Sequence, residues 1–335
     1  MAEQIRLGMV GTGRIGRIHA QTLRQQVAGA ELVSVTDVDL AAAQACASQY
    51  GILQVAENFQ QILDDPSIQA VVIASSTDTH AAFITQAAQA GKHIFCEKPI
   101  AADLEKIDAA LAAVDQAGVK LMIGFNRRFD SNHARIKQAI DSGMVGTPHL
   151  LHIISRDPAP PPIEYVKVSG GFFFDMTIHD FDMARFLLGD VDEVYAAAEV
   201  MVDPRIGEAG DIDTAVITLK FKNGAIGTID NSRQAVYGYD QRVEVFGSAG
   251  SARSDNQYPN AVTFSSAQQV QRDLPLNFFL ERYLASYQAE LEAFVQCVVT
   301  DSPSPVSGQD GRAPVAMALA ALQSYRENRP VKINP

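Results

Sequence analysis

The sequence predicts an α/β fold in two parts: an N-terminal doubly wound parallel sheet, then a C-terminal α+β domain with a large, mainly antiparallel open sheet. In residues 1–124, short apolar runs alternate with longer amphipathic stretches, which is typical of a parallel sheet wrapped by helices. After Phe129, strand-like segments alternate in polarity and follow one another without helices, which indicates antiparallel sheet. We therefore expect one domain over residues 1–124 and a second over residues 125–335.

The N-terminal part contains five apolar runs of strand length. They are residues 5–10, 32–36, 70–74, 93–96 and 120–124. The segments between them are rich in alanine and apolar at helical spacing. They are residues 15–26, 40–50, 80–90 and 103–117. Right-handed crossovers between successive parallel strands make such a pattern a doubly wound sheet.

The C-terminal part shows strands joined by tight turns. The expected strands are residues 194–202, 214–221, 225–231 and 242–247. Lys222-Asn223-Gly224 is a hairpin turn between two of them. Helical patterns at residues 176–188, 280–300 and 313–328 are expected to cover one face of this sheet, and residues 158–162 form a stiff proline loop.

Composition excludes several classes of function. The formal net charge is -12 and no run of lysine or arginine stands out, so neither nucleic acid nor an anionic membrane is an expected partner. No apolar run approaches the roughly 20 residues that cross a bilayer, and the N-terminus enters a strand directly, so we expect a cytoplasmic protein. The three cysteines lack paired spacing, and the seven histidines show no familiar ligand spacing, so no metal is expected.

A glycine motif follows the first strand and opens the first helix. In Gly11-Thr12-Gly13-Arg14-Ile15-Gly16, the first glycine makes a tight turn, the second admits a pyrophosphate, and the third lets helix pack on strand. The N–H groups at the start of the helix then face the phosphates. A plain strand-to-helix turn would use the same glycines, but Asp37 ends the second strand where a ribose-binding carboxylate belongs. We therefore expect a Rossmann-type dinucleotide site.

Asp37 also selects the cofactor. A carboxylate accepts from the ribose hydroxyls of NAD and repels the extra phosphate of NADP, and no basic residue follows it, so NAD is expected. Ser75, Ser76 and Thr77 follow a buried strand at the same edge of the sheet, where they contact the cofactor or serve only as helix caps.

Two further segments carry candidate catalytic groups. Lys98 follows a core strand at the ligand-binding edge, where it can donate to a substrate oxygen, although a solvated lysine is the simpler interpretation of this position alone. Asp175 is expected to cap a helix with His179 one turn further on, so that the carboxylate orients the imidazole. A structural cap beside a packed histidine is the alternative.

These motifs together resemble the Gfo/Idh/MocA family of oxidoreductases, and within it the inositol 2-dehydrogenases. The resemblance spans the chain and rests on the glycine loop with Arg14 and His19, on Glu97-Lys98-Pro99, and on Asp175-x-x-x-His179. It implies that Lys98, Asp175 and His179 are catalytic and that the Lys98–Pro99 bond is cis. The expected cofactor residues are Gly11, Gly13, Arg14, Ile15, Gly16, Asp37, Ser75, Ser76, Thr77, His80, Glu97 and Lys98.

The resemblance also implies a substrate and an assembly. Arg127, Asp157 and Tyr239 lie in segments similar to those that face a polyol, and they are expected to bind it together with Lys98, Asp175 and His179; surface ion pairs or a packed ring are the alternatives. The implied reaction is NAD-dependent oxidation of a secondary hydroxyl, with myo-inositol first and scyllo-inositol or a glucose-type sugar next. A non-catalytic sensor of NAD and sugar is the other class considered, and a homotetramer is expected by family analogy.

Overall fold

A computed structural model describes residues 4–333, which form two compact units. The first unit comprises the chain up to Phe129 together with Ala285–Val315, and the second comprises Asp130–Leu284 and the chain from Ala316 onward. Helix α12 (Gly308–Glu327) therefore contributes residues to both units. None of the helices formed by residues 4–333 combines the length and apolar character needed to span a bilayer.

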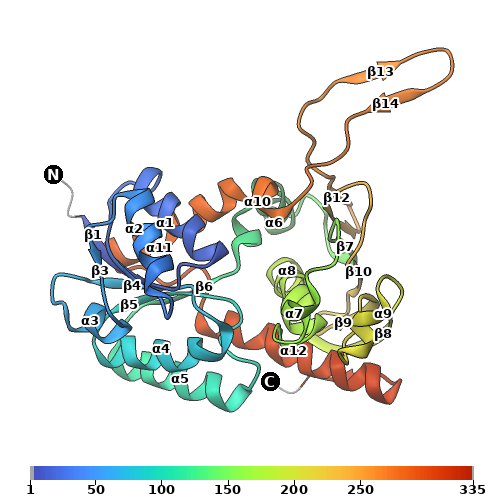
Figure 1. The fold of residues 1–335 in the computed structure, drawn as a ribbon. Helices are drawn as coiled ribbons and strands as arrows, with labels where there is room; N and C mark the ends of the chain where they lie inside the picture. The colour runs from blue at the N-terminus through green and yellow to red at the C-terminus, as the bar shows by residue number, and fades with distance from the viewer. Residues whose placement is uncertain (1–3, 334–335) are drawn as a thin grey trace. The chain divides into compact units, whose positions relative to one another are not determined.

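The first unit contains a six-stranded parallel sheet in the order β3-β2-β1-β4-β5-β6, which confirms the predicted doubly wound fold (Figure 1). Its strands are β1 (Ile5–Val10), β2 (Ala30–Thr36), β3 (Gln54–Val55), β4 (Ala70–Ile73), β5 (His93–Glu97) and β6 (Leu121–Gly124). The chain reverses its direction of progress across the sheet between β1 and β4. In such sheets ligands bind at the carboxyl ends of the strands near this reversal.

Helices cover both faces of this sheet. Helices α4 (Thr77–Gln89) and α5 (Leu104–Ala117) lie together on one face, while α1 (Arg14–Gln25), α2 (Leu40–Tyr50) and α11 (Leu284–Val299) lie on the other; α3 (Phe59–Asp64) follows β3 (Figure 1). Local capping defines several ends: Asp39 and Asp103 accept hydrogen bonds from the first turns of α2 and α5. A 3-10 turn, Asn126–Phe129, follows β6.

Ala285–Val315 belongs to the first unit because of packing contacts that local sequence patterns do not predict. Ile123 of β6 donates its N–H to the Val306 carbonyl at 3.1 Å, so the returning chain adds to the edge of the sheet. Gly308 lies so close to α5 that a Cβ there would stand 2.3 Å from a methyl group of Leu111. These contacts link segments that are nearly 200 positions apart in the sequence.

The second unit is built on a seven-stranded sheet in the order β12-β11-β7-β10-β9-β8-β15, in which only the β7–β10 pair is parallel. This confirms the predicted, mainly antiparallel α+β domain. Its strands are β7 (Pro148–Arg156), β8 (Val191–Glu199), β9 (Thr214–Phe221), β10 (Ile226–Ser232), β11 (Asp240–Gly247), β12 (Gly250–Ser254) and β15 (Val331–Lys332). Strand β7 is absent from the sequence expectations, although it lies in the middle of the sheet.

The two faces of this sheet differ in burial. Alternate residues such as Leu151, Ile217 and Ile229 are buried, whereas Val216 and Phe246 on the opposite face are about half exposed. The second unit also contains α6 (Ser131–Asp141), α7 (Ile163–Val166), α8 (Ile178–Leu188), α9 (Pro204–Glu208) and α10 (Phe279–Arg282). A hairpin of β13 (Thr263–Ser265) and β14 (Val270–Arg272) projects from the sheet (Figure 1).

Candidate active site

The three glycines of the loop after β1 differ in the space around them: two are closely packed, and one faces open space. Gly11 has a φ of +95°, and a Cβ there would lie 2.4 Å from the Ala74 main chain. A Cβ on Gly16 would lie 2.0 Å from the Gly11 carbonyl oxygen. In contrast, a Cβ on Gly13 would meet no atom of the described chain within 4 Å. Packing therefore requires glycine at the first and third positions, and the second leaves room for a ligand at the N-terminus of α1.

Asp37 is held beside this loop by its own hydrogen bonds. Its Oδ2 accepts from the Thr12 N–H at 2.6 Å and from the Thr12 hydroxyl at 3.0 Å, and its Oδ1 accepts from the Asp39 N–H at 3.0 Å. Burial acts to raise the pKa of Asp37, but these hydrogen bonds outweigh it and lower the pKa. A charged carboxylate is therefore fixed next to the glycine loop, which is the arrangement that a ribose contact needs.

The loop after β4 is tied to the residues after β5 by His80. Its Nδ1 lies 2.8 Å from the Pro99 carbonyl oxygen, its Nε2 lies 3.1 Å from the Ser75 carbonyl oxygen, and the ring is buried. Burial lowers the pKa of His80, although the two carbonyl partners act to raise it. Both ring nitrogens face protein carbonyls, so His80 joins the two loops; its contact with a cofactor stays a prediction. Ser76 and Thr77 begin α4 beside this loop, and Ser75 Oγ lies 2.6 Å from the Thr79 hydroxyl.

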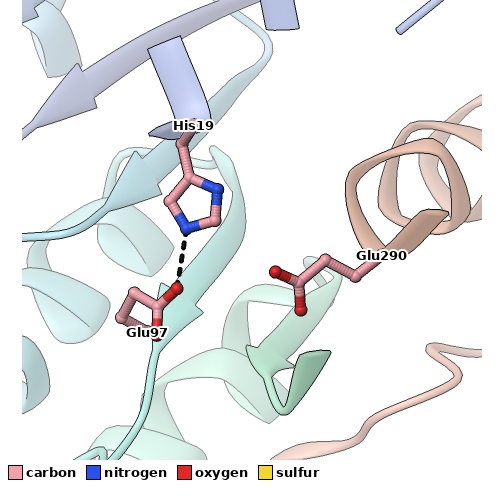
Figure 2. Close-up of side chains that lie close together, drawn as sticks. All are labelled: His19, Glu97 and Glu290. Carbon is pink, nitrogen blue, oxygen red and sulfur yellow. Dashed lines mark hydrogen bonds and ion pairs between the residues drawn. The ribbon is translucent and has the colours of Figure 1, made fainter. Parts of the chain in front are cut away.

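Glu97 and Lys98 stand at the carboxyl end of β5. The Lys98–Pro99 peptide is cis, which confirms the expectation drawn from the family resemblance. Lys98 is half-buried, and Glu97 Oε1 lies 2.7 Å from Nε2 of His19 on α1 (Figure 2). Arg127 lies in the 3-10 turn after β6 and is buried. The first unit thus carries the glycine loop, Asp37, the β4 loop and Lys98 at the ends of its strands.

In the second unit, Asp175 does not cap a helix, and that expectation is wrong. A π-helical turn over Phe173–Thr177 continues directly into α8. The Asp175 N–H donates to the Gly171 carbonyl at 3.0 Å, so the helical hydrogen bonding has already begun before Asp175. Asp175 therefore lies within this turn and His179 in the first turn of α8. Single π turns within helices frequently occur at functional sites.

A buried amide fixes this turn to the sheet. Asn231 of β10 accepts from the Thr177 hydroxyl at 2.7 Å and donates to the Asp180 carboxylate at 2.9 Å. Its amide nitrogen also lies 3.2 Å from the Ser155 carbonyl oxygen on β7. A buried polar group that loses its hydrogen bonds costs free energy, so these bonds fix the position of the helix segment that carries Asp175 and His179.

Arg233, which the sequence analysis did not identify, contacts two of the candidate site residues. Its Nη2 donates to Asp175 Oδ2 at 2.8 Å, and its Nη1 lies 3.4 Å from Asp157 Oδ2. Burial acts to lower the pKa of Arg233, but the two carboxylates outweigh it and raise the pKa. Asp175 also accepts from the Tyr165 hydroxyl at 2.8 Å. A single arginine after a strand has no distinctive sequence pattern, so only its contacts distinguish Arg233 from other arginines.

Strand register explains why Asp157, Arg233 and Tyr239 leave the sheet at one edge. Arg156 of β7 lies opposite Ser232 of β10 and opposite Asp240 of β11. The residues beyond this row are Asp157, Arg233 and Tyr239. Tyr239 is buried and packs edge-on against Tyr283, with ring centroids 6.0 Å apart. The structure therefore brings Asp157, Asp175 and Arg233 into direct contact, and it places Tyr239 at the same sheet edge.

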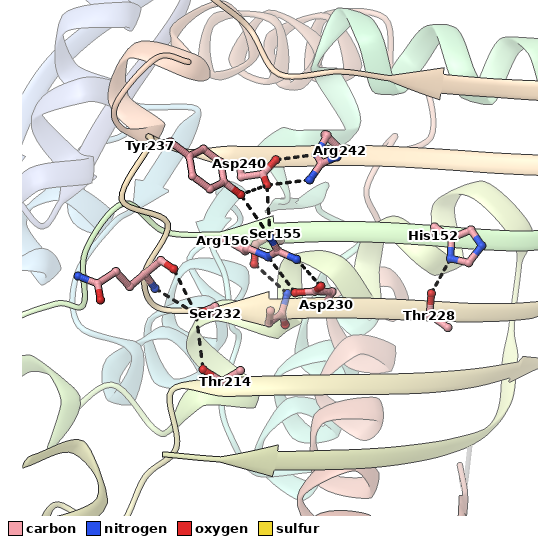
Figure 3. A network of polar contacts seen from close by, with 12 residues as sticks. His152, Ser155, Arg156, Thr214, Thr228, Asp230, Ser232, Tyr237, Asp240 and Arg242 are labelled. Atoms are coloured by element: carbon pink, nitrogen blue, oxygen red, sulfur yellow. Dashed lines mark hydrogen bonds and ion pairs between the residues drawn. The ribbon is translucent and has the colours of Figure 1, made fainter. Parts of the chain in front are cut away.

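A network of charged and polar side chains links the ends of β7, β10 and β11 (Figure 3). Arg156 Nε donates to Asp230 at 3.0 Å on β10, and Arg242 Nε donates to Asp240 at 2.8 Å on β11. The Tyr237 hydroxyl links the two sides: it accepts from Arg156 at 3.2 Å and donates to Asp240 at 2.6 Å. Burial acts to raise the pKa of Asp240, but its hydrogen bonds from Arg242 and Tyr237 lower it.

Comparison with known proteins places this arrangement in a family. Residues 5–125 match the oxidoreductase family with an NAD-binding Rossmann fold, and residues 133–253 match the GFO/IDH/MocA C-terminal domain. The chain belongs to the Gfo/Idh/MocA oxidoreductases. The first unit is thus the family's NAD-binding domain, in agreement with the open position at Gly13 and the anchored carboxylate of Asp37.

Relatives within the family are similar over nearly the full chain. The myo-inositol 2-dehydrogenase of Thermotoga maritima is 46% identical, covering 98% of each chain. The inositol 2-dehydrogenase of Rhizobium meliloti is 44% identical, covering 98% of this chain and 99% of the relative. The scyllo-inositol dehydrogenase of Lactobacillus casei, solved with NAD(H) and scyllo-inositol, superposes with a TM-score of 0.92 at 31% identity over 99% of each chain.

Proposed function

We propose that this family member oxidises a secondary hydroxyl of a cyclic polyol with NAD, and that its substrate is myo-inositol, which becomes 2-keto-myo-inositol. The observation that carries the proposal is the full-length similarity to two proteins named as inositol 2-dehydrogenases, at 46% and 44% identity. The anchored Asp37 and the open space at Gly13 support NAD as the cofactor.

The residues around the glycine loop suit a dinucleotide. The pyrophosphate would lie over Gly13 against the N–H groups of Arg14, Ile15 and Gly16, and the adenosine ribose would donate to Asp37. Bound NAD supplies the acceptor for the hydride. Ser75, Ser76, Thr77, His80 and Glu97 complete the proposed cofactor set.

The chemistry is assigned to three side chains. We propose that His179 accepts the proton of the substrate hydroxyl, that Asp175 orients the imidazole and stabilises its protonated form, and that Lys98 donates to the oxygen as negative charge develops there. Arg233 holds the Asp175 carboxylate for this task. Arg127, Asp157 and Tyr239 are the proposed polyol contacts, since their polar groups match a ring of hydroxyls.

A cofactor and substrate panel tests this proposal. The purified protein is incubated with NAD or NADP and with inositol stereoisomers, pentoses and hexoses, while absorbance of the reduced nicotinamide is followed. We expect rapid reduction of NAD with myo-inositol and little reduction of NADP. Turnover restricted to another polyol would replace the substrate and keep the chemistry. Nucleotide binding without turnover on any polyol would reject the enzyme in favour of a sensor of NAD and sugar.

Scyllo-inositol is the second candidate substrate, favoured by the similarity to the Lactobacillus casei scyllo-inositol dehydrogenase. A glucose-type sugar ranks after it. We further propose a cytoplasmic homotetramer. The half-exposed apolar residues on one face of the second unit's sheet, including Val216 and Phe246, favour burial of that face between subunits. Sedimentation that shows a monomer at working concentration would reject the tetramer.

A further inference from the structure

Three polar side chains of the first unit meet in its interior. His19 comes from α1, Glu97 from the end of β5, and Glu290 from α11 (Figure 2). His19 Nε2 lies 2.7 Å from Glu97 Oε1, and one polar atom from each of the three residues lies within 4.8 Å of the others. One imidazole and two carboxyl groups, from three elements that are distant in sequence, therefore lie close together.

The surroundings of this cluster are apolar. His19 and Glu290 are 0% exposed, and the His19 ring packs edge-on against Phe95 and Tyr287, at centroid distances of 5.2 and 5.8 Å. Both carboxyl oxygens of Glu290 and Nδ1 of His19 lack a hydrogen-bond partner within residues 4–333. A buried carboxylate without a donor is strongly unfavourable, so the charged form of Glu290 has no support from its neighbours.

Protonation resolves this arrangement. Burial raises the pKa of Glu290 well above its ordinary value, and the negative charge of Glu97 raises it further. A neutral Glu290 has one O–H donor, and an oxygen of the Glu97 carboxylate lies within 4.8 Å of one of its carboxyl oxygens. Donation from Glu290 would give Glu97 a second hydrogen bond, beside the contact that its Oε1 makes with the His19 imidazole.

We propose that His19, Glu97 and Glu290 form a buried proton-sharing cluster, in which neutral Glu290 donates to charged Glu97, and that this cluster positions Lys98. The second half of this inference rests on the proposed function, because Lys98 has a catalytic role only there. Glu290 and His19 act as positioning residues: they hold the Glu97 side chain, and Lys98 is the next residue of the chain.

Packing at the end of β5 links the position of the Glu97 side chain to that of Lys98. Glu97 pairs with Gly124 of β6, where a Cβ would stand 3.2 Å from the Glu97 carboxyl carbon. The side chain thus lies close over the neighbouring strand, between α1 and α11. Helix α1 also begins at the glycine loop, so the same cluster joins the proposed phosphate-binding helix to the strand that ends in Lys98. Loss of the proposed hydrogen bond from Glu290 would leave Glu97 less constrained and would shift Lys98.

Infrared difference spectroscopy tests the protonation state without any substrate. Spectra of the wild type and of Glu290→Gln are subtracted at pH 8, where ordinary carboxyl groups are ionised. We expect a C=O stretch of a protonated carboxylic acid in the wild type that is absent from the variant. A difference spectrum with a carboxylate band instead would overturn the cluster. Because this measurement needs no turnover, it decides the state of Glu290 even if the proposed polyol oxidation fails.

Turnover tests the positioning role. Glu290→Leu removes the donor, and we expect its kcat to fall about tenfold to a hundredfold, the range that small misplacements cause. Its Kd for NAD should stay within about threefold, because the substituted residue Glu290 is fully buried and is not one of the proposed cofactor contacts. Glu290→Gln keeps a donor without charge and should restore most of the kcat. Glu292→Leu, on the exposed face of the same helix, is the matched control. Wild-type turnover in Glu290→Leu, or an equal loss in Glu290→Gln, would overturn the role.

Metal analysis tests the alternative that the cluster is a metal site. A histidine and two carboxylates also resemble ligands for a divalent cation. We expect the purified wild type to contain no stoichiometric divalent metal and to keep its activity after dialysis against a chelator. One equivalent of metal in the wild type that is absent from Glu290→Gln would overturn the proton-sharing cluster.

Discussion

Arg233 and Asp175 form a buried ion pair, with Arg233 Nη2 donating to Asp175 Oδ2 at 2.8 Å and an arginine side chain that is 5% exposed. The same guanidinium lies 3.4 Å from Asp157 and stacks over the Phe172 ring at 5.4 Å. One buried cation therefore compensates two carboxylates, one proposed as catalytic and one as a substrate contact. Removal of this cation takes away the positive charge that compensates both carboxylates.

Arg233→Met should lower both stability and turnover. We expect the free energy of unfolding to fall by about 3–5 kcal/mol, the usual effect of breaking a buried pair. The kcat should fall at least about tenfold, because Asp175 loses its anchor. Denaturant unfolding and initial rates measure the two effects. Arg205→Met breaks the exposed Arg205–Asp203 pair of the same unit and should change neither. Equal behaviour of the two variants would contradict the anchoring role.

The glycine loop offers a matched pair of substitutions. Gly13→Ala adds a methyl group that meets no described protein atom within 4 Å, so we expect unchanged thermal stability and weakened NAD binding. Gly16→Ala would place a Cβ 2.0 Å from the Gly11 carbonyl oxygen, so it should destabilise the fold. Melting temperature and NAD titration separate the two effects. Full NAD affinity in Gly13→Ala would argue against a phosphate site at this loop.

Cofactor selection should depend on Asp37. Asp37→Asn removes the charge that accepts from the ribose, and we expect the Kd for NAD to rise about tenfold, in line with the strength of a charged hydrogen bond. Discrimination against NADP should weaken as well. Asp39→Asn is the control, because asparagine caps a helix as well as aspartate and Asp39 caps α2. If the Asp37 variant kept its preference for NAD, another residue would be the selector.

His179 should be essential for chemistry and dispensable for the cofactor. We expect His179→Ala to lower kcat by about 10²–10⁴, the range for loss of a general base, while NAD binding is retained. Initial rates and nucleotide fluorescence give the two quantities. His152→Ala removes an exposed histidine from the sheet of the same unit and serves as the comparison. Undiminished turnover in His179→Ala would refute its assigned role.

The raised pKa of Glu290 predicts a pH dependence of stability. Above the ordinary pKa of 4.5 the unfolded chain releases the proton that the folded chain keeps, so stability falls as pH rises toward the folded pKa. The difference in unfolding free energy between wild type and Glu290→Gln should change by about 1.4 kcal/mol per pH unit in this window. His19 and Glu97 face Glu290 and are common to both proteins. Denaturant unfolding from pH 5 to 8 measures the slope, and parallel curves would show an ionised Glu290.

The sequence by itself determined the features that depend on local pattern. The glycine spacing, the strand that ends at Asp37 and the change from parallel to antiparallel texture follow from short-range periodicity and turn chemistry, and they predicted the doubly wound sheet and the α+β domain. The family motifs around Lys98 and His179 are equally local. They predicted which residue types to examine and the cis bond at Pro99, which the structure contains.

The tertiary structure alone decided the contacts that join distant segments. Arg233, Asn231 and Glu290 have no motif around them. Asn231 donates to Asp180, 51 positions away, and Glu290 lies within 4.8 Å of Glu97, 193 positions away. The π turn at Asp175 and the return of Ala285–Val315 likewise arise from packing. Burial of a charge or amide is paid for by a partner that only folding supplies, so such residues are recognised by what surrounds them and not by their neighbours in sequence.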